Sequence, residues 1–184
     1  MARSSSYRNL KPLDGEALER LAIGYVGRYA TTRAKLAAYL HRKLGERGWE
    51  GPADAPEGGA SAHIDAIVAR FADVGYVDDR GFAEARAASY ARRGYGARRL
   101  NERLRADGIA EDDAATARAA ADENAWAAAL AFAQKRRIGP FSRSATDIDM
   151  RRRALGAMLR AGHSMDVARR IINAMPGEIP EERD

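Results

Sequence analysis

Residues 92–109 read "RRGYGARRLNERLRADGI", and this stretch combines a packed helix with a dense cluster of positive charge. Leu100 and Leu104 are separated by about one helical turn, so they lie on the same face of a helix expected over 97–106. Gly108 follows that helix at a place where glycine commonly ends one. The leucines predict a buried face, and the six arginines of the stretch predict an exposed basic face.

The same pattern recurs on both sides of this stretch. Leu155 and Leu159 lie 55 residues after the equivalent leucines and are followed by "RAGHS", which resembles "RADGI". Leu36 and Leu40 lie 64 residues before them, and the polar insert "EGPADAPEGGA" at 50–60 accounts for most of the excess. Subtracting its eleven residues gives a period of about 53, which is typical of a repeat protein. We expect three diverged units, with the insert as a flexible loop.

Helical periodicity dominates the chain, and alanine, leucine, arginine and glutamate all favour helix. The clearest helix is 63–74, "HIDAIVARFADV", whose apolar residues form one stripe. Ser61 is a candidate N-cap for this helix, and Gly75 is its candidate stop. Asp78 or Asp79 is expected to cap the next helix, whose body reads "FAEARAASYARR".

These patterns predict an all-α protein built from tandem three-helix repeats, with three units and about nine helices. A unit of about 50 residues has a marginal core, so stacking of neighbouring units is expected to form an elongated, curved rod. The alanine-rich third helix of the second unit suggests looser packing and a flexible joint there. The expected segments are a flexible N-terminal segment 1–15, repeat 1 at 16–75 with the loop insert 50–60, repeat 2 at 76–123, repeat 3 at 124–175, and a flexible acidic tail 176–184.

The sequence shows no arrangement of residues typical of an enzyme. It has no cysteine, and its three histidines, His41, His63 and His163, fall in different units without ligand-like spacing. Acidic pairs such as Asp78 and Asp79 are explained by helix capping. We therefore expect no catalytic site, no metal and no cofactor. The absence of a signal-like or membrane-length apolar run favours a cytoplasmic protein without membrane association.

Positive charge is concentrated in three blocks, although the net charge of the chain is only +5. The windows 28–47, 86–105 and 135–153 carry net charges of +5, +6 and +5. Acidic spacers at 50–66 and 107–123 carry −4 and −5. One interpretation is that the blocks are only solvated helix faces of an arginine-rich protein. The alternative is a basic track, aligned along one side of the stacked repeats, that meets a polyanion.

The basic blocks supply the candidate binding residues. Arginine forks suit phosphate and carboxylate equally, so the sequence does not separate a nucleic acid from an acidic protein surface. At the turn 93–96, backbone N–H groups and the Tyr95 ring are candidates for contact with a phosphate or base, although Tyr95 is equally explained by packing of the turn. The candidates are Arg28, Arg33, Lys35, Arg42, Lys43, Arg92, Arg93, Tyr95, Arg98, Arg99, Arg103, Arg105, Lys135, Arg136, Arg137, Arg151, Arg152, Arg153 and Arg160.

Much of the chain, from about Leu18 to Ile172, resembles the RecX family of regulatory proteins. Its most specific part joins two elements at a fixed distance between Phe71 and Ile109. The first element has the pattern G-Y-[VL]-D-D-x-x-F-A and the second G-x-x-[RK]-[LI]-x-x-x-L-x-x-x-G-I. These appear as Gly75, Tyr76, Val77, Asp78, Asp79, Phe82 and Ala83, and as Gly96, Arg99, Leu100, Leu104, Gly108 and Ile109.

The resemblance implies a non-enzymatic modulator of the recombinase RecA, built from tandem three-helix repeats, and we expect a monomer. It implies binding to RecA and to its filament on single-stranded DNA, with inhibition of ATP hydrolysis and strand exchange during DNA repair and recombination. The basic residues above would contact this filament, and possible contact with free DNA follows from the same charge. A stand-alone, sequence-nonspecific DNA-binding protein is the alternative. The 50–60 insert and the alanine-rich helix depart from a typical member.

Overall fold

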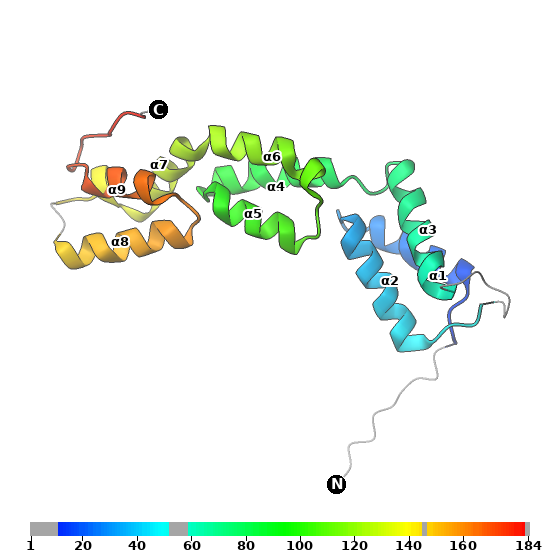
Figure 1. Cartoon of the computed structure of the whole chain (residues 1–184). Helices are drawn as coiled ribbons and strands as arrows, with labels where there is room; N and C mark the ends of the chain where they lie inside the picture. Colours follow the sequence, from blue (N-terminus) through cyan, green and yellow to red (C-terminus); the bar gives the residue numbers. More distant parts are fainter. Residues whose placement is uncertain (1–10, 52–58, 145–146, 183–184) are drawn as a thin grey trace, which may run out of the picture. The chain divides into compact units, whose positions relative to one another are not determined.

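A computed structural model describes residues 11–51, 59–144 and 147–182, in which nine α-helices and one short 3-10 helix are present (Figure 1). The expected all-helical class with three-helix repeats is confirmed, and no regular strand occurs among these residues. The chain divides into two compact units, Met1–Asp78 and Asp79–Asp184. In the part that the structure describes, no helix is both long enough and apolar enough to cross a membrane.

The first unit holds one three-helix repeat around its own apolar core. Leu36 and Leu40 on the second helix are fully buried and pack with Ile64, Ile67 and Phe71 of the third. The predicted apolar stripe of the third helix is therefore its core face. The helices are α1 (Gly15–Val26), α2 (Arg33–Arg47) and α3 (Gly59–Asp73).

The start of this repeat is more ordered than the expected flexible segment 1–15. Leu13 is fully buried and forms a β-bridge with Trp49, with the Glu50 N–H donating to the Leu13 carbonyl at 2.8 Å. Asp14 then caps α1 through the N–H of Ala17 at 2.7 Å. Leu13 is anchored in the core and Asp14 caps the first helix, so both hold the segment before α1 in place. The prediction of a flexible segment is therefore wrong for 11–15. Residues 1–10 lie outside the described residues.

Two other boundaries of the first repeat also differ from the prediction. Helix α3 begins at Gly59, so Ser61 lies inside the helix rather than at its N-cap. The last two residues of the predicted 50–60 loop are therefore helical, and 52–58 lie outside the described residues. Val77, 4% exposed, belongs to the core of the first repeat, which extends past the expected end at residue 75.

The second unit holds two three-helix repeats with separate apolar clusters. Leu100 and Leu104 centre the first cluster, whereas Met158 and Ile171 centre the second. Glycine ends the helix where predicted, because Gly108 has φ +73° and the Ile109 N–H donates to the Leu104 carbonyl at 3.1 Å. The helices are α4 (Asp79–Arg93), α5 (Ala97–Ala106), α6 (Glu111–Glu123), α7 (Ala125–Arg136), α8 (Ile148–Arg160) and α9 (Met165–Asn173).

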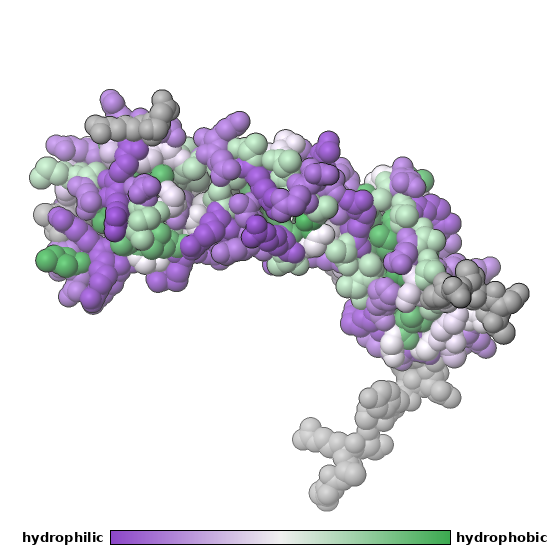
Figure 2. Space-filling view, in the orientation of Figure 1, coloured by the Kyte–Doolittle hydropathy of each residue, from purple (hydrophilic) through white to green (hydrophobic). Residues whose placement is uncertain are grey.

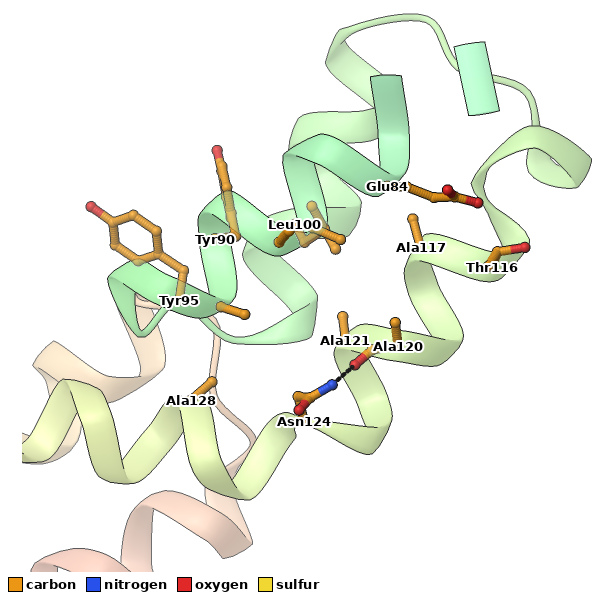
Figure 3. A pocket seen from close by; sticks show the side chains of 13 residues that line it. Glu84, Tyr90, Tyr95, Leu100, Thr116, Ala117, Ala120, Ala121, Asn124 and Ala128 are labelled. Carbon is orange, nitrogen blue, oxygen red and sulfur yellow. Dashed lines mark hydrogen bonds between the residues drawn. The ribbon is translucent and has the colours of Figure 1, made fainter. Parts of the chain in front are cut away.

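The alanine-rich helix α6 packs closely rather than loosely. Ala114 and Ala117 are buried at 0% and 1% exposure, and α6 has the most extensive helix–helix contact among the described elements, with α4. Small side chains let the backbones of the two helices approach closely, so this contact is closer than expected, whereas the expected flexible joint stays a prediction. The same small side chains leave an apolar hollow of about 350 Å³ beside Tyr90 and Ala121 (Figure 3).

The segments after α7 and α9 contact each other. Gly139–Phe141 forms a 3-10 helix between α7 and α8. The Gly177 N–H donates to the Pro140 carbonyl at 2.8 Å, and the Arg170 guanidinium donates to the Glu181 carbonyl. Residues 176–182 are therefore held against the third repeat, which corrects the expectation of a free tail for them. Residues 183–184 lie outside the described residues.

Candidate polyanion-binding surface

Helix α5 has the two faces that its sequence predicts. Leu100 and Leu104 are buried, and the four arginines of this helix are exposed. Figure 2 shows hydrophilic side chains over much of α5. The exposed face is therefore available for electrostatic contact, and the buried face fixes its orientation within the second repeat.

The start of α5 is joined to the end of α8 through the main chain. The Gly96 N–H donates to the Ala161 carbonyl at 2.9 Å, and the Arg98 N–H donates to the Gly162 carbonyl at 3.3 Å. The approach requires glycine, because a Cβ on Gly96 would lie 2.3 Å from the Gly162 oxygen. These contacts link the second and third repeats through carbonyl and amide groups that a helix end otherwise leaves unpaired.

The same bonds remove one predicted anion site. The Gly94, Tyr95 and Gly96 N–H groups donate to the carbonyls of Ala91, Tyr90 and Ala161. A phosphate therefore has no free amide at these three positions. The hydrogen bonds of these three N–H groups argue against the predicted backbone contact with phosphate, whereas contact through the basic side chains around the turn stays a prediction.

Two arginines of α5 cap the end of α8. The Arg98 Nη2 donates to the Leu159 carbonyl at 2.6 Å, and the Arg99 Nη1 donates to the Arg160 carbonyl at 3.4 Å. Arginine at a helix C-terminus satisfies carbonyls that lack an intrahelical partner and complements the negative end of the helix dipole. The Arg98 side chain remains 62% exposed, so it keeps N–H groups that face solvent.

Tyr95 organises two further guanidinium groups. The Arg99 guanidinium carbon lies 4.2 Å from the Tyr95 ring centroid and that of Arg93 lies 5.0 Å away. The Arg93 Nη2 also donates to the Tyr95 hydroxyl at 3.4 Å, and the ring packs 5.2 Å from Tyr90. These contacts agree with packing of the turn. A direct contact of Tyr95 with a partner stays a prediction.

The ends of α4 and α7 complete this basic region. The Lys135 Nζ donates to the Arg92 carbonyl at 2.9 Å. His163 is 4% exposed, and its Nε2 lies 3.1 Å from the carbonyl oxygen of Gly94, just after α4. Burial lowers the pKa of His163, and the hydrogen bond to Gly94 partly opposes that effect. We call the basic residues at this junction the joint cluster: Arg92, Arg93, Arg98, Arg99, Lys135 and Arg160.

A second group of predicted residues surrounds a pocket of about 320 Å³ between the end of α7 and α8. Its apolar lining includes Ile138 and Ile172. Arg137 adopts a left-handed conformation, φ 55°, at the end of α7. We call this the arginine pocket, and its basic lining consists of Arg136, Arg137, Arg151 and Arg153.

Other predicted residues have local partners. Arg103 Nε lies 3.1 Å from a carboxylate oxygen of Asp107, which is 2% exposed and also lies 3.7 Å from Arg86 Nη2. Arg103 therefore stabilises a buried carboxylate, whereas Arg105 on the same helix is exposed. Arg152 pairs with Asp149 at 3.1 Å.

In the first repeat, Arg42 and Lys43 share Glu46 at 2.9 and 2.6 Å. These contacts lower the pKa of Glu46, chiefly through the Lys43 hydrogen bond. Arg33 and Lys35 lie in the first turn of α2. Arg28 lies just after α1, beside three tyrosines that the charge-based prediction passed over.

Comparisons with known proteins agree with this architecture. Residues 78–117 match the family model of the second three-helix domain of RecX. The chain is 31% identical over 134 residues to "Regulatory protein RecX" of Myxococcus xanthus (strain DK1622), spanning 67% of this chain and 66% of that protein.

Two solved structures share the fold at 18% sequence identity. The structure of RecX from Lactobacillus salivarius superposes with a TM-score of 0.59, covering 86% of this chain and 94% of that chain. A second structure, of regulatory protein RecX, has a TM-score of 0.55 and covers 85% of this chain and 72% of that chain. The family model and the Myxococcus xanthus relative agree with the repeats and the central sequence elements. The chain therefore belongs to the RecX family of regulatory proteins.

Proposed function

We propose that this protein binds RecA and the RecA filament on single-stranded DNA, and that it inhibits the ATPase and recombinase activity of RecA. The observation that carries the proposal is the joint cluster, which gathers basic side chains from two repeats at one junction. Membership of the RecX family supports regulation of RecA as the general role. The inhibition and the contact residues are our proposal.

The joint cluster has the chemistry that such a filament requires. Arginine forms bidentate contacts with phosphate and carboxylate, so it is suited to both the DNA and acidic protein surface of a filament. Arg98 and Arg99 are anchored on carbonyls of the next repeat, which limits their rotational freedom before binding. Less side-chain entropy is then lost when a partner binds.

The proposal is tested by the RecA ATPase rate on single-stranded DNA with increasing amounts of this protein. We expect inhibition at well below one copy per RecA, because a regulator that acts on the filament does not need to cover all the DNA. Inhibition that begins only when free DNA is saturated would instead favour the stand-alone DNA-binding alternative. No inhibition at any ratio would refute the proposal.

The contact surface is tested by charge reversal at exposed positions without a structural role. Arg92→Glu with Arg153→Glu changes the joint cluster and the arginine pocket together, whereas Arg98 and Arg103 are less informative because each supports the fold. We expect the double variant to weaken inhibition at least tenfold. Arg80→Glu with Arg169→Glu is the matched control, because it makes the same change in net charge at exposed positions outside both groups.

A further inference from the structure

The first repeat carries a hollow that its charge pattern does not reveal. Helices α1 and α2 and the turn after α1 line a solvent-open hollow of about 570 Å³, between three tyrosines and three arginines. No acidic side chain lines this hollow. We call it the tyrosine hollow, and its aromatic and basic residues are Tyr25, Tyr29, Tyr39, Arg20, Arg28 and Arg42.

The tyrosine rings form a connected group that ends at the surface. Tyr25 and Tyr39 stack with ring centroids 4.2 Å apart and planes 15° from parallel. Both are partly buried and pack against the apolar core, so core packing explains them. Tyr29 lies 5.4 Å from Tyr25, is tilted by 50° and is 58% exposed. Core packing does not explain this exposed ring at the edge of the hollow.

Two of the three arginines around the hollow have carboxylate partners outside it. Arg20 and Arg42 are held by exposed ion pairs with Glu16 and Glu46, at 3.3 and 2.9 Å. Exposed pairs of this kind contribute little stability and are readily exchanged. Arg28 is exposed, and no ion pair is recorded for it within residues 11–51, 59–144 and 147–182. At least one cation therefore faces the hollow without a competing carboxylate there.

We propose that the tyrosine hollow binds an unpaired nucleobase of single-stranded DNA, with the flanking phosphates on its arginines. Aromatic rings combined with cationic groups are the usual basis of sequence-tolerant single-strand binding, because every base offers a π-face. An acidic peptide would use the arginines but would leave the Tyr29 ring without a stacking partner. The inference deepens the proposed function by giving the first repeat a direct contact with the single strand.

The experiment compares two oligonucleotides of about 12 nucleotides, one of thymidine and one of abasic sites, by fluorescence anisotropy without RecA. Both carry the same number of phosphates, so they differ only in the bases. We expect the wild type to bind the thymidine strand about 5- to 150-fold more tightly, the range for stacking of one base on an aromatic side chain. Tyr29→Ala should remove most of that difference, and Tyr29→Phe should retain it.

Tyr76→Ala is the matched control, because Tyr76 is another exposed tyrosine of the first unit, at 63%, and lies outside the hollow. Equal wild-type affinity for the two strands would overturn the inference, as would a base preference that survives Tyr29→Ala. The RecA ATPase assay separates this result from the proposed function. Base-dependent binding without ATPase inhibition would sink only the RecA proposal, and inhibition without base dependence would sink only the tyrosine hollow.

Discussion

Replacing Gly96 by alanine is the sharpest test of how the second and third repeats are joined. Gly96 has φ −79° and ψ 165°, a conformation that alanine adopts without strain. The substitution therefore changes only the steric contact with the end of α8. The added Cβ would lie 2.3 Å from the Gly162 oxygen and 2.7 Å from the His163 nitrogen, both of which are main-chain atoms.

The expected cost follows from that geometry. An ordinary Cβ contact begins at 3.4 Å, so the two segments must separate by about 1 Å. Separation weakens the bonds from Gly96 to Ala161 and from Arg98 to Gly162, each of which contributes about 1 kcal/mol net. With the strain of overpacking, we expect the free energy of unfolding to fall by about 3 kcal/mol.

The assay is urea unfolding of the second unit followed by tryptophan fluorescence. The chain has two tryptophans, Trp49 in the first unit and Trp126 in the second. A Trp49→Phe background leaves Trp126, 7% exposed, as the reporter of the second unit. Gly156→Ala is the control, because Gly156 lies inside α8 and its nearest atom is the end of the flexible Arg160 side chain.

The control should gain about 0.5–1 kcal/mol, because alanine favours helix over glycine. A Gly96→Ala variant whose free energy of unfolding stays within about 0.5 kcal/mol of the parent would refute the reasoning. It would show that the joint relaxes without loss and that the main-chain contact does not hold the repeats together.

Three further predictions concern burial and capping. His163 has a lowered pKa in the folded state, so its contribution to stability is present above about pH 6.5 and is lost as the pH falls toward the folded pKa. Urea unfolding between pH 7.5 and 5 should show this loss in the wild type and less of it in His163→Gln. Arg103→Ala should lower the free energy of unfolding by about 1–2 kcal/mol, because it removes one partner of the buried Asp107. Arg105→Ala should change the free energy of unfolding by less than about 0.5 kcal/mol. Equal effects of the two substitutions in chemical denaturation would contradict this prediction. Asp14→Ala should cost about 1 kcal/mol in thermal or urea unfolding through loss of the α1 cap, and an unchanged midpoint would show that Leu13 alone fixes the helix start.

Local periodicity predicted the helices well because each one buries an apolar stripe of its own. The helix over 97–106 was predicted residue for residue, since Leu100, Leu104 and the glycines around them agree on its position. The N-terminal end of the first repeat was predicted less well. Leu13 is anchored by Trp49, 36 residues away in sequence, and such a long-range contact leaves no periodic signal.

The candidate site was predictable in its charge but not in its arrangement. The positions of the arginines in the sequence predicted basic blocks, and several residues of these blocks do lie in the joint cluster. Charge counting does not distinguish Arg103, which pairs with a buried carboxylate, from Arg105 two residues later. It also passed over Tyr25, Tyr29 and Tyr39, because their association depends on the packing of α1 against α2.

The junction between α8 and α5 has a consequence for how such a protein diversifies. Its central bonds join peptide groups, and its closest approach depends on Gly96 and Gly162 having no side chain. Exposed residues nearby whose side chains make no bond to the junction, such as Arg92, can therefore be exchanged without moving one repeat against the next. Related proteins can in this way differ in the surface that binds a partner while they keep the same main-chain junction between the second and third repeats. The same junction could carry a newly designed binding surface.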